Sequence, residues 1–568
     1  MSLSAAGESL SLDPAPPRVW ALTWLTPLVC RVLFVVLVLF GVLSRLHYLH
    51  SADAIGLAPD EAQYWLWSKQ LDWSYYSKPG MVAWIIAGST AIFGDTMPAV
   101  RYPALLIGVL TTVLTYLLTA KLFNSEKLAL GAVGLCHVVP MFIAGSMLMT
   151  IDPPFVLFWA LATCLFVVAV VDNKKWAWPL AGLAIGLSFL SKYAALLWLV
   201  GVLVALLADR NLRRHLWTPW PWVMTAVAAV CTLPVVLWNA GHGWVSAQHV
   251  RADTTSGFKL LEPLSFLGGT IAAVNPLLFI LIVAASVYAF RVARRSDGGV
   301  GGGGGVVGVL SHPARARLLV LTVLPYAALV TASTFFTNAQ INWSAPVWFA
   351  FLIVTAWFMG TRMQSLAKWK PWRGLLWGTI LTALIVAPLA HNTRSLYPMF
   401  AYIQTNWLGN KTVSVRKWDP TARMQGWAGF AADLDAARLA HLSPDAFILA
   451  NDRTDASALA FYLPGQPKTY VMGPYIEDPE RRGRTSQFDL WPDRSLDVNS
   501  TQLLGRDAIY FGTKWPVLAK AFESVTELDP IEVNAIVGGK SFNLTTRRVY
   551  ALRNFKGFNK PVDGKVDF

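Results

Sequence analysis

Long apolar stretches separated by short polar segments occupy the first two thirds of the chain. A helix needs about 20 mainly apolar residues to cross a bilayer, so each stretch is a candidate membrane span. Eleven stretches approach or exceed that length, at residues 32–50, 98–120, 128–147, 153–171, 176–190, 192–208, 219–239, 264–290, 318–335, 343–360 and 374–391. The pattern predicts an all-α polytopic membrane protein with about eleven transmembrane helices.

Composition agrees with this prediction. The chain has 568 residues, of which 55% are hydrophobic and 14% charged, whereas soluble domains carry roughly 25% charged residues. The net charge of +14 is explained by loops that orient a membrane protein, so no nucleic-acid partner is expected. All four cysteines lie inside apolar stretches, which indicates buried side chains rather than disulfides.

Basic residues are concentrated in every second loop. The loops rich in Lys and Arg lie at residues 121–127, 174–175, 210–214, 291–317 and 362–373. Basic loops stay on the cytoplasmic side of a membrane, so residues 1–31 are expected to be a cytoplasmic segment. An odd number of spans within residues 32–391 then places residues 392–568 on the periplasmic side of a bacterial inner membrane.

The C-terminal segment has the pattern of a small soluble α/β domain. Phe447–Ala450 and Ala508–Phe511 are short apolar runs typical of buried strands. Residues 433–441 and 454–462 have helical patterns instead. We see no catalytic motif in this segment, so the chemistry is expected elsewhere in the chain.

The predicted outer loop, residues 51–97, carries a dense aromatic and charged motif. From Pro59 it reads PDEAQYWLWSKQLDWSYYSKPGMVAW, which predicts a helix with an aromatic face in the membrane interface. The apolar run at 81–93 is short for a span and predicts a second interfacial or re-entrant helix. Asp60 and Glu61 begin the first helix, where the helix dipole stabilises negative charge. Asp60 can therefore act as a base or cation ligand, or it simply caps the helix.

Four further charged residues are predicted near the same membrane face. Lys78 can bind a phosphate as a point charge, or its side chain can extend toward lipid headgroups. Asp152 and Lys192 lie at outer helix ends, where charges are costly and are either functional or paired, and these two can pair with each other. Arg101 begins the second span and either anchors that helix or contacts an anionic ligand.

These residues come from separate parts of the chain, yet the topology brings them to one side of the membrane. A carboxylate can deprotonate an acceptor hydroxyl, and lysines can offset the charge of a phosphate leaving group. The combination suits transfer from a lipid-linked phosphate donor. No phosphate loop of the G-x-x-x-x-G-K type occurs, so no nucleotide site is expected.

The motif at residues 59–84 resembles the C-type (GT-C) membrane glycosyltransferases. The similarity is to the branch that holds the protein O-mannosyltransferases and the bacterial 4-amino-4-deoxy-L-arabinose lipid A transferases. YWLWS, LDW and YYSKP look like bacterial members that decorate lipopolysaccharide. The resemblance covers roughly residues 32–392. It implies a GT-C fold and an inverting transfer of one sugar from a polyprenyl-phosphate donor on the periplasmic face.

The resemblance also implies residue roles. It matches Asp60, followed by Glu61, to the proposed base, and Asp152 to the acidic residue of the next outer loop. It matches Lys78 and Lys192 to residues that hold the donor phosphate, with Arg101 as a further candidate. The motifs around these positions add four residues near the donor or acceptor, namely Tyr64, Tyr76, Asn338 and Asn342.

Metal dependence stays open at this stage. Some aminoarabinose transferases have a metal-linked Glu where this chain has Ser77, so the resemblance does not carry a metal over, and a divalent metal stays possible without being a required cofactor. The expected acceptor is lipid A, lipopolysaccharide or another envelope glycolipid, with membrane lipids around it. A protein acceptor is the alternative.

Two other functions compete with single-sugar transfer. An O-antigen ligase or polymerase also uses polyprenyl-linked glycans. A lipid-linked sugar transporter or flippase should have internal repeats and polar residues at the bilayer midplane. The charges of this chain cluster at one membrane face instead, which favours the enzyme.

Overall fold

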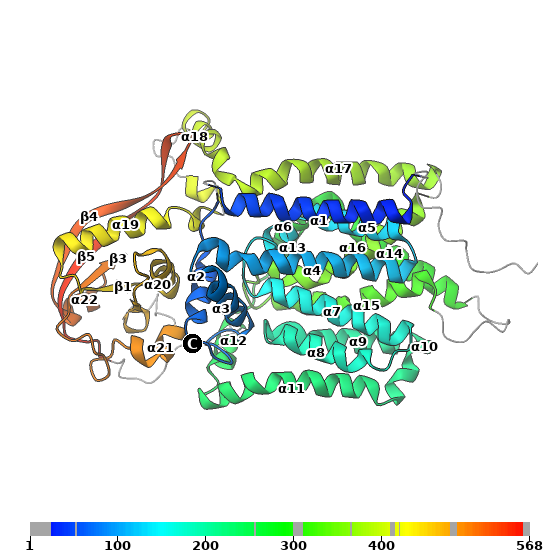
Figure 1. Ribbon diagram of the computed structural model, residues 1–568, viewed down its shortest axis with the longest axis horizontal. Coiled ribbons are helices and arrows are strands. Elements are labelled where there is room, and N and C mark those ends of the chain that lie inside the picture. The colour runs from blue at the N-terminus through cyan, green and yellow to red at the C-terminus, as the bar shows by residue number, and fades with distance from the viewer. Residues whose placement is uncertain are drawn as a thin grey trace, which may run out of the picture.

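The structure is a computed structural model in which a long bundle of helices is followed by a smaller mixed domain (Figure 1). It describes residues 24–51, 54–254, 257–298, 310–363, 366–408, 415–419, 421–476 and 486–559. The predicted fold class is confirmed, since helices dominate and one small sheet lies near the C-terminus.

Eight helices among the described residues are long and apolar enough to cross a membrane. They are α1 (Pro27–Leu49), α4 (Met97–Phe123), α7 (Asp152–Val171), α11 (Trp220–Gly241), α14 (Pro276–Gly298), α15 (His312–Ser333), α16 (Ala345–Arg362) and α17 (Leu366–His391). A ninth span results if the pieces from Tyr193 to Trp217, bent by 113°, are counted together.

The predicted count of eleven spans is not confirmed, because three of the predicted stretches form only shorter helices and a fourth, which still contains a span, is interrupted. The stretch at 128–147 is divided into α5 (Glu126–His137) and α6 (Pro140–Gly145), and the stretch at 264–290 into α13 (Glu262–Val274) and α14. Proline lacks the N–H that would continue each helix. The separate stretches predicted at 176–190 and 192–208 give the 13-residue α8 (Ala177–Phe189), the 3-10 turn η1 (Tyr193–Leu196) and α9 (Leu197–Ala208).

Three short helices lie between the bundle and the C-terminal domain (Figure 1). They are α2 (Pro59–Ser68), α3 (Met81–Phe93) and α12 (Val245–Thr254). The aromatic face of α2 packs inside the protein, because Trp67 stacks on Tyr75 at 4.4 Å and Trp65 meets Phe461 edge-on at 5.0 Å. The rings that we expected in the lipid interface therefore form part of the contact between the two regions.

The C-terminal domain is a five-stranded sheet covered by helices, with strand order β2-β1-β3-β5-β4. Strands β1 (Phe447–Ala450), β2 (Thr469–Val471) and β3 (Ala508–Phe511) are parallel, whereas β4 (Phe522–Val537) and β5 (Lys540–Phe555) form an antiparallel hairpin. The helices of this domain are α18 (Tyr397–Asn406), α19 (Trp427–His441), α20 (Arg453–Tyr462), α21 (Gln487–Leu490) and α22 (Pro516–Ala521).

The sequence predictions for this domain were confirmed in part. The two predicted strands coincide with β1 and β3. The two predicted helices, at 433–441 and 454–462, lie within α19 and α20. The long hairpin was missed, because most of β4 is exposed and has no strong apolar alternation. Gly538 and Gly539 at its tip both have positive φ, at 56° and 76°, which a two-residue turn of this hand requires.

Candidate active site

Helix α2 begins with two adjacent carboxylates that have opposite surroundings. Pro59 suits the first helical position, because that N–H has no partner within a helix anyway. Glu61 caps the helix through its side chain, since its Oε2 accepts the N–H of Ala58 at 2.8 Å. Successive residues of a helix point about 100° apart, so Asp60 is exposed whereas Glu61 is fully buried.

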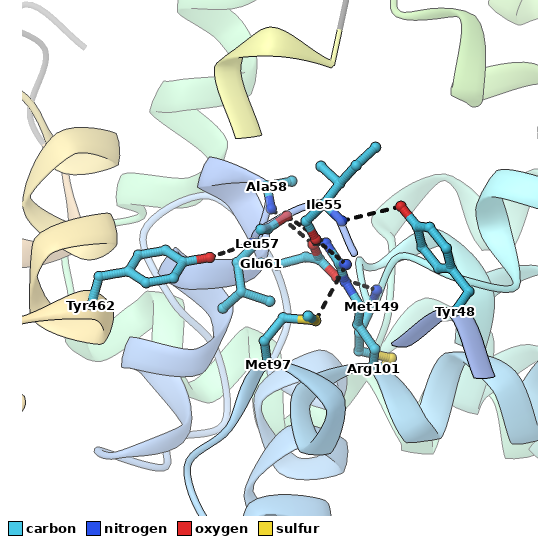
Figure 2. A network of polar contacts seen from close by, with 10 residues as sticks. Tyr48, Ile55, Leu57, Ala58, Glu61, Met97, Arg101, Met149 and Tyr462 are labelled. Atoms are coloured by element: carbon cyan, nitrogen blue, oxygen red, sulfur yellow. Dashed lines mark hydrogen bonds and ion pairs between the residues drawn. The ribbon is translucent and has the colours of Figure 1, made fainter. Parts of the chain in front are cut away.

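Glu61 is the centre of a closed polar network (Figure 2). Arg101 of α4 donates from Nε to Oε1 of Glu61 at 3.0 Å and from Nη2 to Oε2 at 2.7 Å. The N–H of Met149 donates to the same Oε1 at 2.9 Å. Arg101 also donates to the carbonyls of Ile55 and Gly56, both at 2.7 Å. The network thus joins the segment before α2 to α4 and to the turn before α7.

This geometry points to a supporting role for the pair. The side chain of Arg101 is 1% exposed and that of Glu61 is 0% exposed. We expected a phosphate contact for Arg101 and a catalytic role for Glu61, but the contacts above engage both groups inside the fold. Removing one partner of a buried ion pair leaves an uncompensated charge, at a cost of about 3–5 kcal/mol.

Asp152, Lys192 and Asn342 form a second polar cluster, which joins three parts of the bundle. Lys192 Nζ donates to Asp152 Oδ1 at 2.9 Å, and Asn342 Nδ2 donates to Oδ2 at 2.5 Å. The side chains of Lys192 and Asp152 are 12% and 13% exposed. Lys192 is in extended backbone at the break between α8 and η1, which lets its side chain leave the helix direction. The ion pair that the sequence suggested is present, and Asn342 fixes the other carboxylate oxygen.

Tyr64 connects the two carboxylates that the sequence singled out. It lies four residues after Asp60, and residues at this spacing stack on one face of a helix. Burial raises the pKa of Tyr64 well above its usual range, and the negative charges of Asp60 and Asp152 raise it further. The phenol therefore stays protonated. A positive charge, that of Arg453, acts in the opposite direction on the same phenol.

Lys78 lies in a tight turn that is bonded to the segment carrying Lys192. The carbonyl of Lys78 accepts the N–H of Tyr75 at 2.9 Å, and Ser74 pairs with Pro79 across the turn. Ser74 Oγ lies 3.3 Å from the hydroxyl of Tyr193, the residue after Lys192. The fold thus brings the segments of the two predicted phosphate ligands together.

Two predicted residues lie apart from the Asp152 cluster. Tyr76 donates its backbone N–H to Gln487 of the C-terminal domain at 2.7 Å, and its ring lies 5.1 Å from that of His249. Asn338 accepts a hydrogen bond from Lys259 Nζ at 2.6 Å. Of the two asparagines of the NAQINWSAP segment, Asn342 is therefore the one bonded to Asp152.

A cleft of about 360 Å³ lies between α2 and the C-terminal domain. Pro59 and Asp60 line one side, and Arg416, Arg423 and Arg547 are on the other. Sequence reasoning missed these arginines, since we treated the C-terminal domain as lacking chemistry. No local motif marks them, because they lie in three separate segments of that domain.

Metal ligation has little support in this donor set. Among the described residues, no three His, Cys, Asp or Glu side chains come together in a metal-binding arrangement. The two oxygens of Asp152 already accept from an ammonium and an amide. Both partners are hydrogen-bond donors whose hydrogens carry positive charge. They would repel a cation, so the site around Asp152 does not fit a divalent ion.

The fold is similar to that of a protein of known structure. The structure aligns with that of ArnT from Cupriavidus metallidurans in the apo state, with a TM-score of 0.56 and 16% identity, over 92% of this chain and 97% of that one. A second structure of the same protein, described as bound to undecaprenyl phosphate, aligns with a TM-score of 0.55. Residues 77–238 match the family described as dolichyl-phosphate-mannose-protein mannosyltransferase.

Curated relatives narrow the class. The chain is 29% identical over 317 residues to a lipid A galacturonosyltransferase, RgtD, of Rhizobium johnstonii. That alignment covers 54% of this chain and 61% of the relative. It is 30% identical over 188 residues to an undecaprenyl phosphate-alpha-4-amino-4-deoxy-L-arabinose arabinosyl transferase of Pseudomonas aeruginosa. That alignment covers 30% of this chain and 33% of the relative. The match thus spans less than two thirds of either relative. In fold, in family match and in these relatives, the chain is similar to the GT-C membrane glycosyltransferases.

Proposed function

We propose that this protein is an inverting glycosyltransferase that moves one monosaccharide from a polyprenyl-phosphate-sugar to an envelope glycolipid, with lipid A as the first candidate. One observation carries the proposal: Asp60 is exposed at the edge of a cleft, and Glu61 next to it accepts the N–H of Met149, three residues before the Asp152 of the Asp152–Lys192 pair. The names of the relatives, which act on lipid A or use undecaprenyl-phosphate donors, support it.

In the proposed reaction, Asp60 removes the proton from the acceptor hydroxyl. The hydroxyl oxygen attacks the anomeric carbon from the face opposite the phosphate, and the carbon–oxygen bond to the phosphate breaks. The polyprenyl phosphate leaves with the electron pair, and the configuration at the anomeric carbon is inverted. Asp60 suits this role because it is exposed at a helix N-terminus, where the dipole stabilises a carboxylate.

Lys78 and Lys192 are proposed to bind the donor phosphate and to offset the charge that develops as it leaves. An ammonium has three N–H donors, and the Asp152 bond uses one of those on Lys192. Asp152 keeps the ammonium in place, and Asn342 keeps Asp152 in place. Preorganised donors of this kind contribute to catalysis because they need no rearrangement during the reaction.

Tyr64 and the Glu61–Arg101 pair are proposed to support this machinery. The protonated phenol of Tyr64 is a hydrogen-bond donor beside two carboxylates, which suits orientation of Asp60 or the acceptor hydroxyl. Glu61 and Arg101 hold the first turn of α2 against α4. This support fixes the position from which Asp60 reaches the cleft.

The same proposal includes an orientation in the membrane. Residues 32–391 form the transmembrane glycosyltransferase domain, and residues 392–568 form a periplasmic domain in an inner-membrane protein. Residues 1–31 are the proposed cytoplasmic segment, of which residues 1–23 lie outside the described part of the chain. The distribution of basic loops supports this orientation.

Mass spectrometry of envelope glycolipids tests the function. A strain lacking the gene is complemented with wild type or with Asp60→Asn, at matched protein levels in the membrane. We expect one glycolipid to lose the mass of a single sugar in the deletion strain, and only wild type to restore it.

Other outcomes would replace the proposal. Loss of whole glycan chains would favour an O-antigen ligase or polymerase, and a change confined to glycoproteins would favour a protein O-glycosyltransferase. Restoration of the glycolipid by Asp60→Asn would remove Asp60 as the base. An unchanged envelope with donor accumulating in the cytoplasmic leaflet would favour a transporter.

A further inference from the structure

The cleft between α2 and the C-terminal domain has its own chemistry, distinct from the Asp152 cluster. Its volume of about 360 Å³ falls within the range of small-molecule sites. Three guanidinium groups line it, from Arg416, Arg423 and Arg547. These belong to three separate segments of the C-terminal domain, so the fold rather than a local motif assembles them.

Arg547 is held rigidly and has donor capacity left over. Its guanidinium pairs with Asp455 at 2.9 Å and packs on the rings of Trp427, Phe430 and Phe511 at 5.2–5.8 Å. Its Nε is buried and has no hydrogen-bond partner among the described residues. A buried donor without a partner costs free energy, and a ligand oxygen in the cleft would satisfy it.

Gln425 presents the complementary group in the same cleft. The residue is 6% exposed, and its Nε2 donates to Asp419 at 3.1 Å and to Thr421 at 3.3 Å. These bonds fix the amide orientation, because a carboxylate accepts only from the NH₂ side. The Oε1 of Gln425 is buried and has no partner within the described ranges. Two residues that line the cleft therefore carry a buried donor and a buried acceptor without a partner among the described residues, and small side-chain shifts toward a ligand would let them meet an oxyanion and a hydroxyl.

Among the described residues, no ion pair joins Arg416 or Arg423 to an acidic residue of the cleft, although the charge of Arg416 counteracts the rise that burial causes in the pKa of Asp455. Asp455 faces Arg547, and Asp452 caps α20 by accepting from the N–H groups of Thr454 and Asp455. Arg416 and Arg423 are both exposed. Guanidinium groups bind phosphate and carboxylate in paired hydrogen bonds. Asp60, on the opposite side of the cleft, is the base of the proposed function.

We propose that this cleft binds an anionic group on the sugar headgroup of the acceptor, a phosphate or a carboxylate, through Arg416, Arg423 and Arg547. Gln425 accepts a hydrogen bond from a neighbouring sugar hydroxyl. The C-terminal domain is then the acceptor-recognition element, and it presents a second hydroxyl of the bound headgroup to Asp60. This inference rests on the proposed function for the identity of the acceptor, while the anion site itself can be tested without catalysis.

Direct binding to the full-length protein in detergent tests the site. The probes are bisphosphorylated lipid A, the same lipid with its phosphates removed, and the dephosphorylated lipid carrying one carboxylate-bearing sugar acid. We expect at least one anionic probe to bind about tenfold more tightly than the neutral lipid, as charge-assisted hydrogen bonds imply. The probe that keeps this advantage identifies phosphate or carboxylate as the recognised group.

Variants connect the binding to the arginines. Arg423→Gln changes an exposed side chain and should reduce the advantage of the anionic probe about tenfold, with the protein still folded. Arg547→Gln should reduce it further, but its packing on three rings makes a folding defect part of its effect. Lys417→Gln is the matched control, because Lys417 is exposed and adjacent to Arg416 but does not line the cleft.

Equal binding of all three probes would overturn the anion site. It would also be overturned if Arg423→Gln and a folded Arg547→Gln both bound the anionic probe with the same advantage over the neutral lipid as wild type. A loss of the advantage in Lys417→Gln as large as in Arg423→Gln would also overturn it, because it would indicate general surface charge. If the arginine variants lose binding while wild type transfers no sugar to any probe, the site stands and the proposed function fails.

Discussion

Asp60 and Glu61 are the same kind of group at consecutive positions, yet the fold gives them opposite environments. Glu61 is fully buried, and both of its oxygens accept hydrogen bonds from Arg101 and from backbone N–H groups. Asp60 is exposed and lines a cleft. A carboxylate with every lone pair engaged stabilises structure, whereas one open to a cleft can accept a proton from a ligand.

The Asp152 cluster lies between these two extremes. Both of its carboxylate oxygens have partners, but the partners are a lysine and an asparagine that are themselves only partly buried. A substrate phosphate can compete for such partners, while it cannot reach Arg101. The comparison therefore separates a buried ion pair, a partly buried cluster and an open carboxylate, and each can be tested by one kind of substitution.

The largest effect is expected for Asp60→Asn. The amide cannot take the acceptor proton, so the transfer rate should fall about 10³-fold, within the range for loss of a general base. The thermal midpoint of unfolding should stay close to that of wild type, because Asp60 is exposed. A wild-type kcat in a steady-state assay with a polyprenyl-phosphate-sugar would show that the open carboxylate is not the base.

Glu61→Gln should act on folding instead. It leaves Arg101 as a buried charge without its partner, at a cost of about 3–5 kcal/mol. We expect a lower melting temperature and lower yield in detergent, measured by scanning fluorimetry. The double variant Glu61→Gln with Arg101→Met should recover part of this loss, because no unpaired charge remains. A Glu61→Gln protein with wild-type stability and no activity would place Glu61 with the chemistry.

Lys192→Ala should reduce kcat about 10²-fold, as loss of one preorganised charge donor does elsewhere. Its effect tests whether the ion pair with Asp152 serves the donor or only the bundle. Lys192→Arg is the control, since it keeps the positive charge near Asp152. If Asp152→Asn in the Lys192→Ala background restores stability but not transfer, the lysine acts on substrate.

Lys78→Ala should raise the Michaelis constant for the donor by about tenfold, because one charge-assisted contact to the phosphate is lost. Lys69→Ala provides a nearby comparison, since Lys69 pairs with Asp95 away from the cluster. Unchanged donor kinetics in Lys78→Ala would indicate that this side chain extends toward lipid headgroups.

The smallest effect is expected for Asn342→Ala. One neutral donor to a carboxylate is removed, worth about 1 kcal/mol, or roughly a fivefold loss in kcat. Asn338→Ala, in the same segment but bonded to Lys259, should change kcat less than twofold. Equal losses in the two variants would show that the segment matters as a whole and that the bond to Asp152 has no special part.

The sequence was sufficient where local pattern determines structure. Apolar runs located the helices, and the short runs of β1 and β3 were predicted to the residue. Pattern failed where a helix is interrupted, because hydrophobicity continues across Pro140 and Pro276 although the backbone hydrogen bonds do not. Spacing also could not distinguish Asp60 from Glu61, since their difference depends on Arg101, forty residues away.

The candidate site shows the same limit at longer range. The pairing of Asp152 with Lys192 was one of the alternatives raised by topology alone, and the structure has it. The bond from Asn342 and the arginines of the cleft were not foreseeable, because they join segments that share no local signal. Side chains with remote partners therefore need the folded structure before a role can be assigned.

Two contacts between the bundle and the C-terminal domain use backbone groups on the bundle side. The N–H of Leu57 donates to the hydroxyl of Tyr462 at 2.6 Å, and the N–H of Tyr76 donates to Gln487 Oε1 at 2.7 Å. Backbone donors survive almost any substitution at their own positions. A chimaera that takes its C-terminal domain from a relative would therefore need to retain a hydroxyl and an amide at these two places, and the transplanted domain would bring its own acceptor preference with it.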